Sequence, residues 1–151
     1  MTDTTPAVAN MADDLPLDTA ELHIVKPGTN IRTGWIITLA GPGHPQTIEL
    51  MNEGERERLH KAAQIERTQI NGRKWKGDED EQPEDARRKT IARVCRRIVG
   101  WTPVDFGEGP VTFSQENAVK VFMDPKKGAY FGQVVDFLTA ERAFMPGSEN
   151  S

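Results

Sequence analysis

The residues of this chain that could carry chemistry are few and widely separated. Histidine occurs at three places along the sequence: His23, His44 and His60. A zinc site needs paired His or Cys ligands at a helical or strand interval, and none of the three has such a neighbour. The single cysteine, Cys95, lies between Val94 and Ile98 on an apolar stripe, where a buried thiol is inert. The sequence therefore predicts no metal site and no cysteine nucleophile.

A glycine turn and an acidic run are the remaining candidates for chemistry. The turn Gly107-Glu108-Gly109 lacks the following glycine, lysine or helix start that phosphate-binding loops require. The carboxylates of residues 78–81 follow one another directly, so we expect them to be solvated rather than held as an acid–base pair. Both patterns favour a protein that is not an enzyme and that binds no cofactor.

The composition narrows the class of protein further. A length of 151 residues predicts one domain with a single packed core. The formal net charge of −4 opposes nucleic-acid binding by the whole surface, but it does not exclude binding by a local basic patch. One cysteine leaves no internal disulfide and fits a reducing compartment. No apolar run could cross a bilayer, and the first residues do not resemble a signal peptide. We therefore expect the cytoplasm and no membrane partner.

The first half of the sequence predicts a tail, a small sheet and a helix. Residues 1–17 mix Thr, Ala, Asp and Pro without periodicity, which is typical of a disordered tail. Alternating apolar residues at 21–25 and 31–40 predict a β-hairpin, and residues 46–51 could add a third strand. A helix is expected over 53–70, with a thin apolar stripe between mixed charges. Such a helix either touches the core on one narrow face or binds a partner.

The middle of the sequence predicts an acidic linker followed by a basic helix. Residues 72–84 combine an Asn-Gly stop with a self-repelling acidic run, so we expect a mobile linker inside one domain over 18–145. Trp75, within this linker, is either a binding anchor or folds back onto the domain. The helix expected over 84–99 carries six cations outside its apolar stripe: Arg87, Arg88, Lys89, Arg93, Arg96 and Arg97.

Residues 99–124 are expected to form the joint at the centre of the fold. Gly100 ends the preceding helical pattern, and Ser114 is a natural N-cap for a short helix. Four aromatic residues gather in this stretch: Trp101, Phe106, Phe113 and Phe122. A chain with so few aromatic residues would hardly place four of them in a solvated loop. The elements together predict an α+β fold, with an N-terminal β-hairpin or small antiparallel sheet packed with three to four α-helices.

The last helix, expected over 128–144, is apolar around more than half of its circumference and precedes loose residues at 146–151. A helix of this kind either lies in the middle of a core or offers a surface to a partner. In the second case aromatic side chains would carry most of the binding energy. The partner-binding anchors would be Tyr130, Phe131, Phe137 and Phe144.

The basic helix over 84–99 offers a different function. Its six cations could hold phosphates, because one basic helix face is a common nucleic-acid footprint. The acidic run directly before the helix could neutralise the same face, and the negative net charge also opposes this function. A nucleic-acid-binding module therefore ranks below a protein-binding one.

Three segments of the second half resemble a known family. They are Val-Gly-Trp-Thr-Pro-Val at 99–104, Val-Thr-Phe-Ser-Gln-Glu-Asn-Ala at 111–118, and Gln-Val-Val-Asp-Phe at 133–137, ahead of Phe144. This pattern is similar to the C-terminal part of the tail assembly chaperones of long-tailed bacteriophages and covers residues 91–144. The hairpin with its Gly-Pro-Gly-His-Pro loop resembles, more loosely, the start of other small phage structural proteins.

The resemblance implies a non-enzymatic helper in the host cytoplasm. Proteins of that family keep the hydrophobic tape-measure protein soluble and help tail-tube subunits gather on it, and a homo-oligomer is compatible with this role. The acidic linker and the β-rich N-terminal half depart from the family pattern. The alternative is a structural virion protein, such as a head, tail or decoration component, located in the particle.

Overall fold

The computed structural model describes residues 7–72 and 82–146. The predicted linker at 72–84, including Trp75, therefore lies mostly outside the described residues, as do the two chain ends. Of the predicted tail, residues 7–17 are described. They are exposed and irregular except for one 3-10 turn, η1 (Ala12–Asp14).

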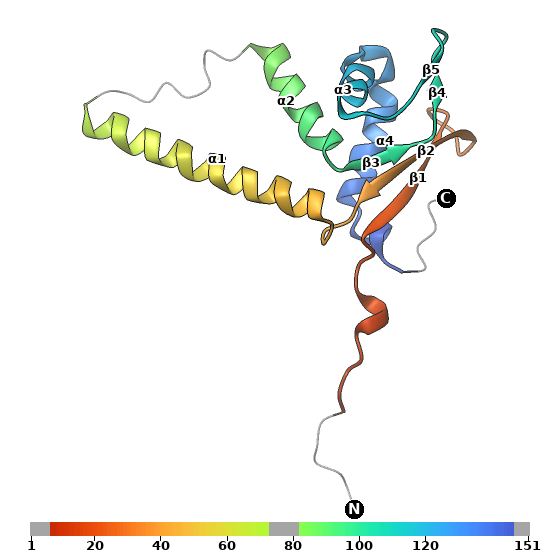
Figure 1. Ribbon diagram of the computed structural model, residues 1–151, viewed down its shortest axis with the longest axis horizontal. Helices are drawn as coiled ribbons and strands as arrows, with labels where there is room; N and C mark the ends of the chain where they lie inside the picture. The colour runs from red at the N-terminus through yellow and green to blue at the C-terminus, as the bar shows by residue number, and fades with distance from the viewer. Residues whose placement is uncertain (1–6, 73–81, 147–151) are drawn as a thin grey trace, which may run out of the picture.

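A three-stranded antiparallel sheet forms the base of the molecule, as Figure 1 shows. Strands β1 (Thr19–Val25) and β2 (Arg32–Ala40) form the predicted hairpin, and β3 (Ile98–Trp101) pairs with β2 to give the order β1-β2-β3. Alternate residues face the core because side chains alternate across a strand; on β2 these are Trp35, Ile37 and Leu39. Strands from both sides of the predicted linker thus pair in one sheet.

The helices follow in the order of the sequence. They are α1 (Pro45–Ile70), α2 (Pro83–Cys95), α3 (Gln115–Met123) and α4 (Gly128–Thr139). A small ribbon, β4 (Val104–Asp105) with β5 (Pro110–Val111), precedes α3, and the turns η2 (Pro125–Lys127) and η3 (Glu141–Phe144) flank α4. This confirms the predicted α+β class.

The predicted third strand at 46–51 is wrong, because those residues form the first turns of α1. The ring Nδ1 of His44 accepts a hydrogen bond from the Gln46 backbone N–H at 3.1 Å, which caps the helix. Pro45 occupies the first helical turn, where its fixed φ suits a helix and its missing N–H costs nothing. The place beside β2 is taken by β3, from the predicted joint.

Two other predicted helices are shorter in the structure. The basic helix expected over 84–99 ends at Cys95, because residues from Ile98 join the sheet. The C-terminal helix expected over 128–144 ends at Thr139, where Ala140 adopts an extended conformation before η3. This break turns Phe144 back against Phe137, with ring centroids 5.5 Å apart.

An aromatic cluster fills the space between the sheet and the helices. The predicted joint residues Trp101 and Phe122 both contact Trp35, at centroid distances of 5.3 and 6.0 Å, and Phe113 packs on Trp101 at 5.3 Å. Phe122 is buried, whereas Phe106 lies at the edge with 36% of its surface exposed. Of the four predicted joint residues, Phe122 is thus buried, Trp101 and Phe113 are half-buried against the core, and Phe106 is exposed at its edge. Trp35 of β2 lies at the centre of this cluster.

Glutamine side chains cover both edges of the sheet. At the β1 edge, the Gln133 amide accepts from the Val25 N–H at 3.0 Å and donates to the Val25 carbonyl at 2.9 Å, as a neighbouring strand would. At the β3 side, Gln46 and Gln115 both donate to the Ile98 carbonyl. Unpaired strand edges invite pairing with other chains. These amides satisfy one residue on each edge strand and tie α1, α3 and α4 to the sheet.

Candidate functional site

The histidines lie in three separate environments. His23 is half-buried on β1, His44 caps α1, and His60 is exposed on α1 beside Gln64. Within residues 7–72 and 82–146, no three His, Cys, Asp or Glu side chains are grouped so that they could hold a metal ion. In the same ranges no helix is long and apolar enough to cross a bilayer.

Cys95 is fully buried at the end of α2. Burial raises the pKa of its thiol to about 12, because the charged thiolate would lose its hydration. Its backbone carbonyl accepts a hydrogen bond from the Gln115 amide at 3.0 Å, which is a structural role. The environment is the opposite of the electropositive, partly exposed site of a reactive cysteine.

We expect Cys95 to resist thiol reagents in the folded protein. Because the reactive species is the thiolate, and because the side chain is buried, reaction with a disulfide reagent at pH 8 should need at least local opening of the fold. The rate should rise by about a hundredfold or more in denaturant. Rapid reaction of the native protein would show that the end of α2 opens readily.

The aromatic residues predicted as partner anchors lie mainly in the core. Phe137 and Phe144 are buried, so they are not a surface that a partner could reach in this fold. Tyr130 and Phe131 are half-buried and pack on Trp35 and Phe122, respectively. The structure thus favours the first of the two readings of the last helix, a helix in the middle of the core. Partner binding by these residues is not the role their packing suggests.

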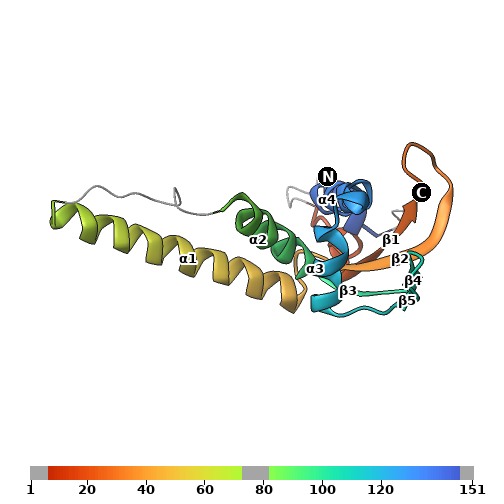
Figure 2. The same cartoon turned by 90° about the horizontal axis from the view of Figure 1, so that it is seen from above.

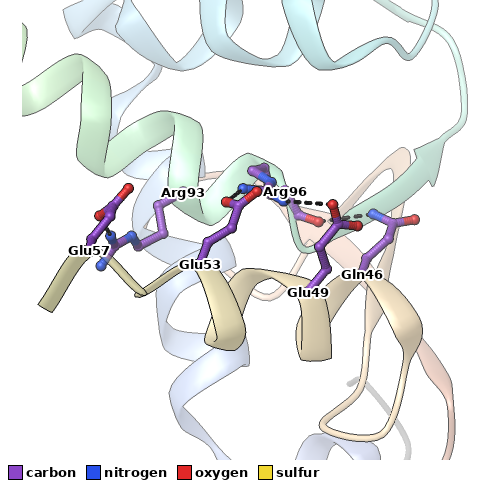
Figure 3. A network of polar contacts seen from close by, with 6 residues as sticks. All are labelled: Gln46, Glu49, Glu53, Glu57, Arg93 and Arg96. Carbon is purple, nitrogen blue, oxygen red and sulfur yellow. Dashed lines mark hydrogen bonds and ion pairs between the residues drawn. The ribbon is translucent and has the colours of Figure 1, made fainter. Parts of the chain in front are cut away.

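The basic helix is bound to the rest of the fold through its last turns. Figure 3 shows Arg93 of α2 and Arg96, the residue directly after α2, reaching the acidic side of α1. Arg93 pairs with Glu57 at 3.3 Å, and Arg96 pairs with Glu53 and, at 3.9 Å, with Glu49. Carboxylates one turn apart on α1 thus meet arginines at the end of α2 and directly after it. These exposed and half-exposed pairs orient the two helices but contribute little stability each, roughly 0 to 1 kcal/mol.

Arg97 is engaged in a different way. Its Nη2 donates to the Ala40 carbonyl at 2.6 Å, and its guanidinium carbon lies 5.6 Å from the centre of the Phe144 ring. Burial lowers its pKa, because desolvation disfavours the charged form. Three of the six cations predicted as a nucleic-acid footprint, Arg93, Arg96 and Arg97, therefore contact acidic or carbonyl groups of the same chain. These contacts oppose the phosphate-binding hypothesis.

Helix α1 forms an arm that leaves the body of the molecule, whereas α2 packs on α3 with Ile91 and Cys95 in the core. In both views α1 begins beside the sheet and extends away from it, while α2 returns toward the sheet (Figures 1 and 2). Of the residues of α1, all of which are described, only Thr47 is buried. A long helix with so little packing gains little of the tertiary stabilisation on which most protein helices depend.

The apolar residues of α1 lie mainly on the side turned away from α2. Ile48, Met51, Leu59 and Ile70 have between 47% and 76% of their surface exposed in the described part of the chain. At 100° per residue they share one face, opposite the side of Glu49, Glu53 and Glu57. We call the side with these four apolar residues the outer face of α1. Glu55 and Glu66 fall within the same arc, so this face carries exposed apolar side chains interspersed with carboxylates. Exposed apolar residues on a projecting helix are a feature of interaction sites.

Comparison with known proteins gives no relative for this chain: no family model, no curated protein and no solved structure matches it. The functional argument for the α1 arm therefore rests on its geometry. Sequence reasoning found the thin stripe of the helix over 53–70 and left open whether it serves a core or a partner. It missed the ion pairs to α2, although carboxylates at 49, 53 and 57 follow the helical interval and could have indicated a basic neighbour.

Proposed function

We propose that this protein is a non-enzymatic phage morphogenesis factor, a tail assembly chaperone that binds the tape-measure protein and tail-tube subunits in the host cytoplasm. The observation that carries the proposal is the α1 arm, a long helix with one buried residue and an uncovered outer face. The resemblance of residues 91–144 to the chaperone family supplies the identity of the partners. Neither argument requires a cofactor or a catalytic group.

The arm suits a protein that holds an apolar chain in solution. Its outer face offers Ile48, Met51 and Leu59 to a partner helix, in the manner of helix-in-groove and helix-pair recognition. Charged residues border this face on both sides, and Glu55 and Glu66 lie within it, which keeps the free arm soluble. The body has its own buried core and would remain folded while the arm binds.

The proposal is tested by producing the tape-measure protein of the same phage with and without this chain. We expect the chain to keep the tape-measure protein in the soluble fraction and to purify with it. Met51→Lys together with Leu59→Lys should reduce capture by about tenfold or more, because both charges enter an apolar contact. The single variant Leu59→Lys should also weaken capture, and its matched control is Gln64→Lys, which adds one lysine on the opposite side of α1 and should have little effect.

Three results would contradict the proposal. One is a tape-measure protein that is equally soluble without the chain, and another is equal loss of capture by the control variant. The third is tight duplex DNA binding that weakens steeply with rising salt, which would indicate phosphate contacts. Recovery of the chain in purified particles at a fixed stoichiometry would instead identify it as a structural virion protein.

A further inference from the structure

Strand β1 is one edge of the three-stranded sheet (Figure 1). We propose that its free edge, formed by Thr19, Glu21 and His23, binds an extended basic segment of a partner protein, which adds to the sheet as a fourth strand. This surface is separate from α1, so the inference does not rest on the proposed function. It is carried by the backbone groups of β1 that point away from β2 and by the charges beside them.

The hydrogen bonds of β2 show which groups of β1 face outward. Ile36 of β2 donates to the Thr102 hydroxyl at 2.9 Å and accepts from the Thr102 N–H at 2.9 Å, so its backbone groups point toward the β3 side. His23 lies opposite Ile36 in the register of β1 with β2. Opposite residues of an antiparallel pair exchange either both hydrogen bonds or neither. The N–H and carbonyl of His23 therefore point away from β2.

The same relation holds at the other end of β1. Ala40 donates to the Arg97 carbonyl at 2.7 Å and accepts from the Arg97 guanidinium at 2.6 Å, so its groups also point toward the β3 side. Thr19 lies opposite Ala40 and therefore faces outward. Glu21, between Thr19 and His23, has the same direction, because the direction alternates along a strand. Within 7–72 and 82–146, no hydrogen bond joins the outward groups of these three residues to another residue.

Amide groups of the same chain fill the place of a neighbouring strand at both ends of the free edge. At one end the Gln133 side chain accepts from the Val25 N–H at 3.0 Å and donates to the Val25 carbonyl at 2.9 Å. At the other end the Phe144 carbonyl accepts from the Leu17 N–H at 2.6 Å. The edge thus already binds peptide-like groups on either side of its three free residues. An extended segment of about five residues would satisfy them.

The free edge is accessible and has a groove beside it. Thr19 and Glu21 are exposed, and His23 is half-buried. His23 also lines a groove between β1 and α4, together with Leu22 and Phe137 among others. Side chains of an added strand alternate between the two faces of the sheet. Those on the helix side would therefore enter this groove.

The charges beside the free edge favour a basic occupant. Glu21 lies at its centre, Asp18 directly precedes it, and Asp136 lines the groove. Arg32 also lines the groove, but it lies opposite Val25, outside the three free residues. A lysine or arginine of the added strand beside Glu21 would form a cross-strand pair of opposite charges, which stabilises a sheet.

The same charges oppose β1 of a second copy as the occupant. Only one antiparallel register of two β1 strands uses all three free residues, and it places Glu21 of one copy opposite Glu21 of the other. Like charges directly opposite each other destabilise a strand pair. A basic strand carries no such cost.

Binding of synthetic peptides to the full chain tests the occupant. The probe is a fluorescein-labelled peptide of about seven residues, an ordinary strand length, in which valine and lysine alternate. Fluorescence anisotropy should show it to bind at least about tenfold more tightly than the same peptide with glutamate for lysine. Backbone N-methylation of the lysine peptide keeps its charges, removes its donors and should weaken binding by about tenfold or more. Equal binding of either comparison peptide, or no binding of the lysine peptide up to about 1 mM, would overturn the inference.

Two variants of Glu21 separate its charge from its backbone. Glu21→Gln removes the charge and should weaken the lysine peptide by about threefold. Glu21→Pro also removes the outward N–H, which an edge strand tolerates, and should weaken it by about a further fivefold. Thermal unfolding checks the fold, and Thr19→Pro, at the first strand position, replaces Glu21→Pro should that variant not fold. Glu108→Gln, in the exposed turn between β4 and β5, is the control and should change nothing. Wild-type affinity in both Glu21 variants would overturn the assignment.

Hydrogen exchange shows where the peptide lies. In the chain alone the amides of Glu21 and His23 should exchange quickly, and that of Leu22, which points toward β2, slowly. A saturating lysine peptide should slow exchange at Glu21 and His23 by at least about fivefold. The Met51→Lys, Leu59→Lys variant should bind the peptide unchanged, which separates this site from the proposed function. Slowing confined to α1 or α2 would overturn the assignment, as would a dimer of the chain alone that Glu21→Pro abolishes, because the occupant would then be a second copy.

Discussion

Replacing Trp35 by Ala is expected to lower the free energy of unfolding by about 4 kcal/mol, in the range found for buried aromatic residues. Trp35 is 4% exposed and contacts four other rings: Trp101, Phe106, Phe122 and Tyr130. These rings belong to β3, the loop between β4 and β5, α3 and α4. Loss of the indole therefore leaves a cavity where the sheet meets the helices, and urea unfolding measures the cost.

Two variants control this prediction. Phe106→Ala removes a ring at the exposed edge of the same cluster and should cost less, roughly 1 kcal/mol. Trp35→Phe keeps a ring and removes the buried Nε1–H, which has no hydrogen-bond partner among the described residues, so its cost should lie between the two. If Trp35→Ala and Phe106→Ala lowered the free energy of unfolding equally, Trp35 would not be the central residue of the aromatic cluster.

Gly41→Ala is expected to destabilise the protein by roughly 2 to 3 kcal/mol, as overpacking of a rigid site does. Gly41 is buried where the chain passes from β2 toward α1, and its N–H donates to the Asp18 carbonyl at 2.7 Å. A methyl group there would overlap the Leu17 carbonyl oxygen and press on the Phe144 ring at 3.3 Å. Because the first obstacle is backbone, it cannot move aside as a side-chain end would.

The control for Gly41 lies two residues away. Gly43 has no atom within 4 Å of the place where a methyl group would stand, and its φ is not in the left-handed region. Gly43→Ala should therefore change the melting temperature by a degree or two at most. If Gly41→Ala and Gly43→Ala lowered the stability by similar amounts, the segment around Leu17 would not be packed against Gly41 as described.

The elements with strong local signals could be predicted from the sequence. Alternation at 21–25 and 31–40 specified the hairpin, and Ser114 marked the start of α3, where its hydroxyl accepts from the Asn117 N–H at 3.0 Å. The joint residues Trp101, Phe113 and Phe122 were predicted for the core because aromatic residues are scarce in this chain. In each case one short segment contained the whole signal.

The elements that depend on distant partners could not be predicted in this way. Residues 46–51 have enough apolar character for a strand, but His44 caps a helix there and the Gln46 side chain donates to the Arg96 and Ile98 carbonyls. From the sequence, Phe137 and Phe144 could belong either to a partner-binding surface or to the core. The end of α4 at Thr139 brings their two rings together inside the fold. The sequence predicted the helix of the arm and its thin apolar stripe. It did not predict that the helix is exposed, because that depends on α1 extending away from the sheet.

The central claim is that α1 is an interaction arm that the body does not stabilise. Hydrogen exchange of the dilute, monomeric chain tests it most directly. The outer half of α1, from about Glu57 to Ile70, should exchange quickly, while α3 and the sheet stay protected, because exchange follows local stability. Adding the tape-measure protein should slow exchange in that half. Protection of the outer half in the free monomer equal to that of α3, unchanged by the partner, would contradict the claim.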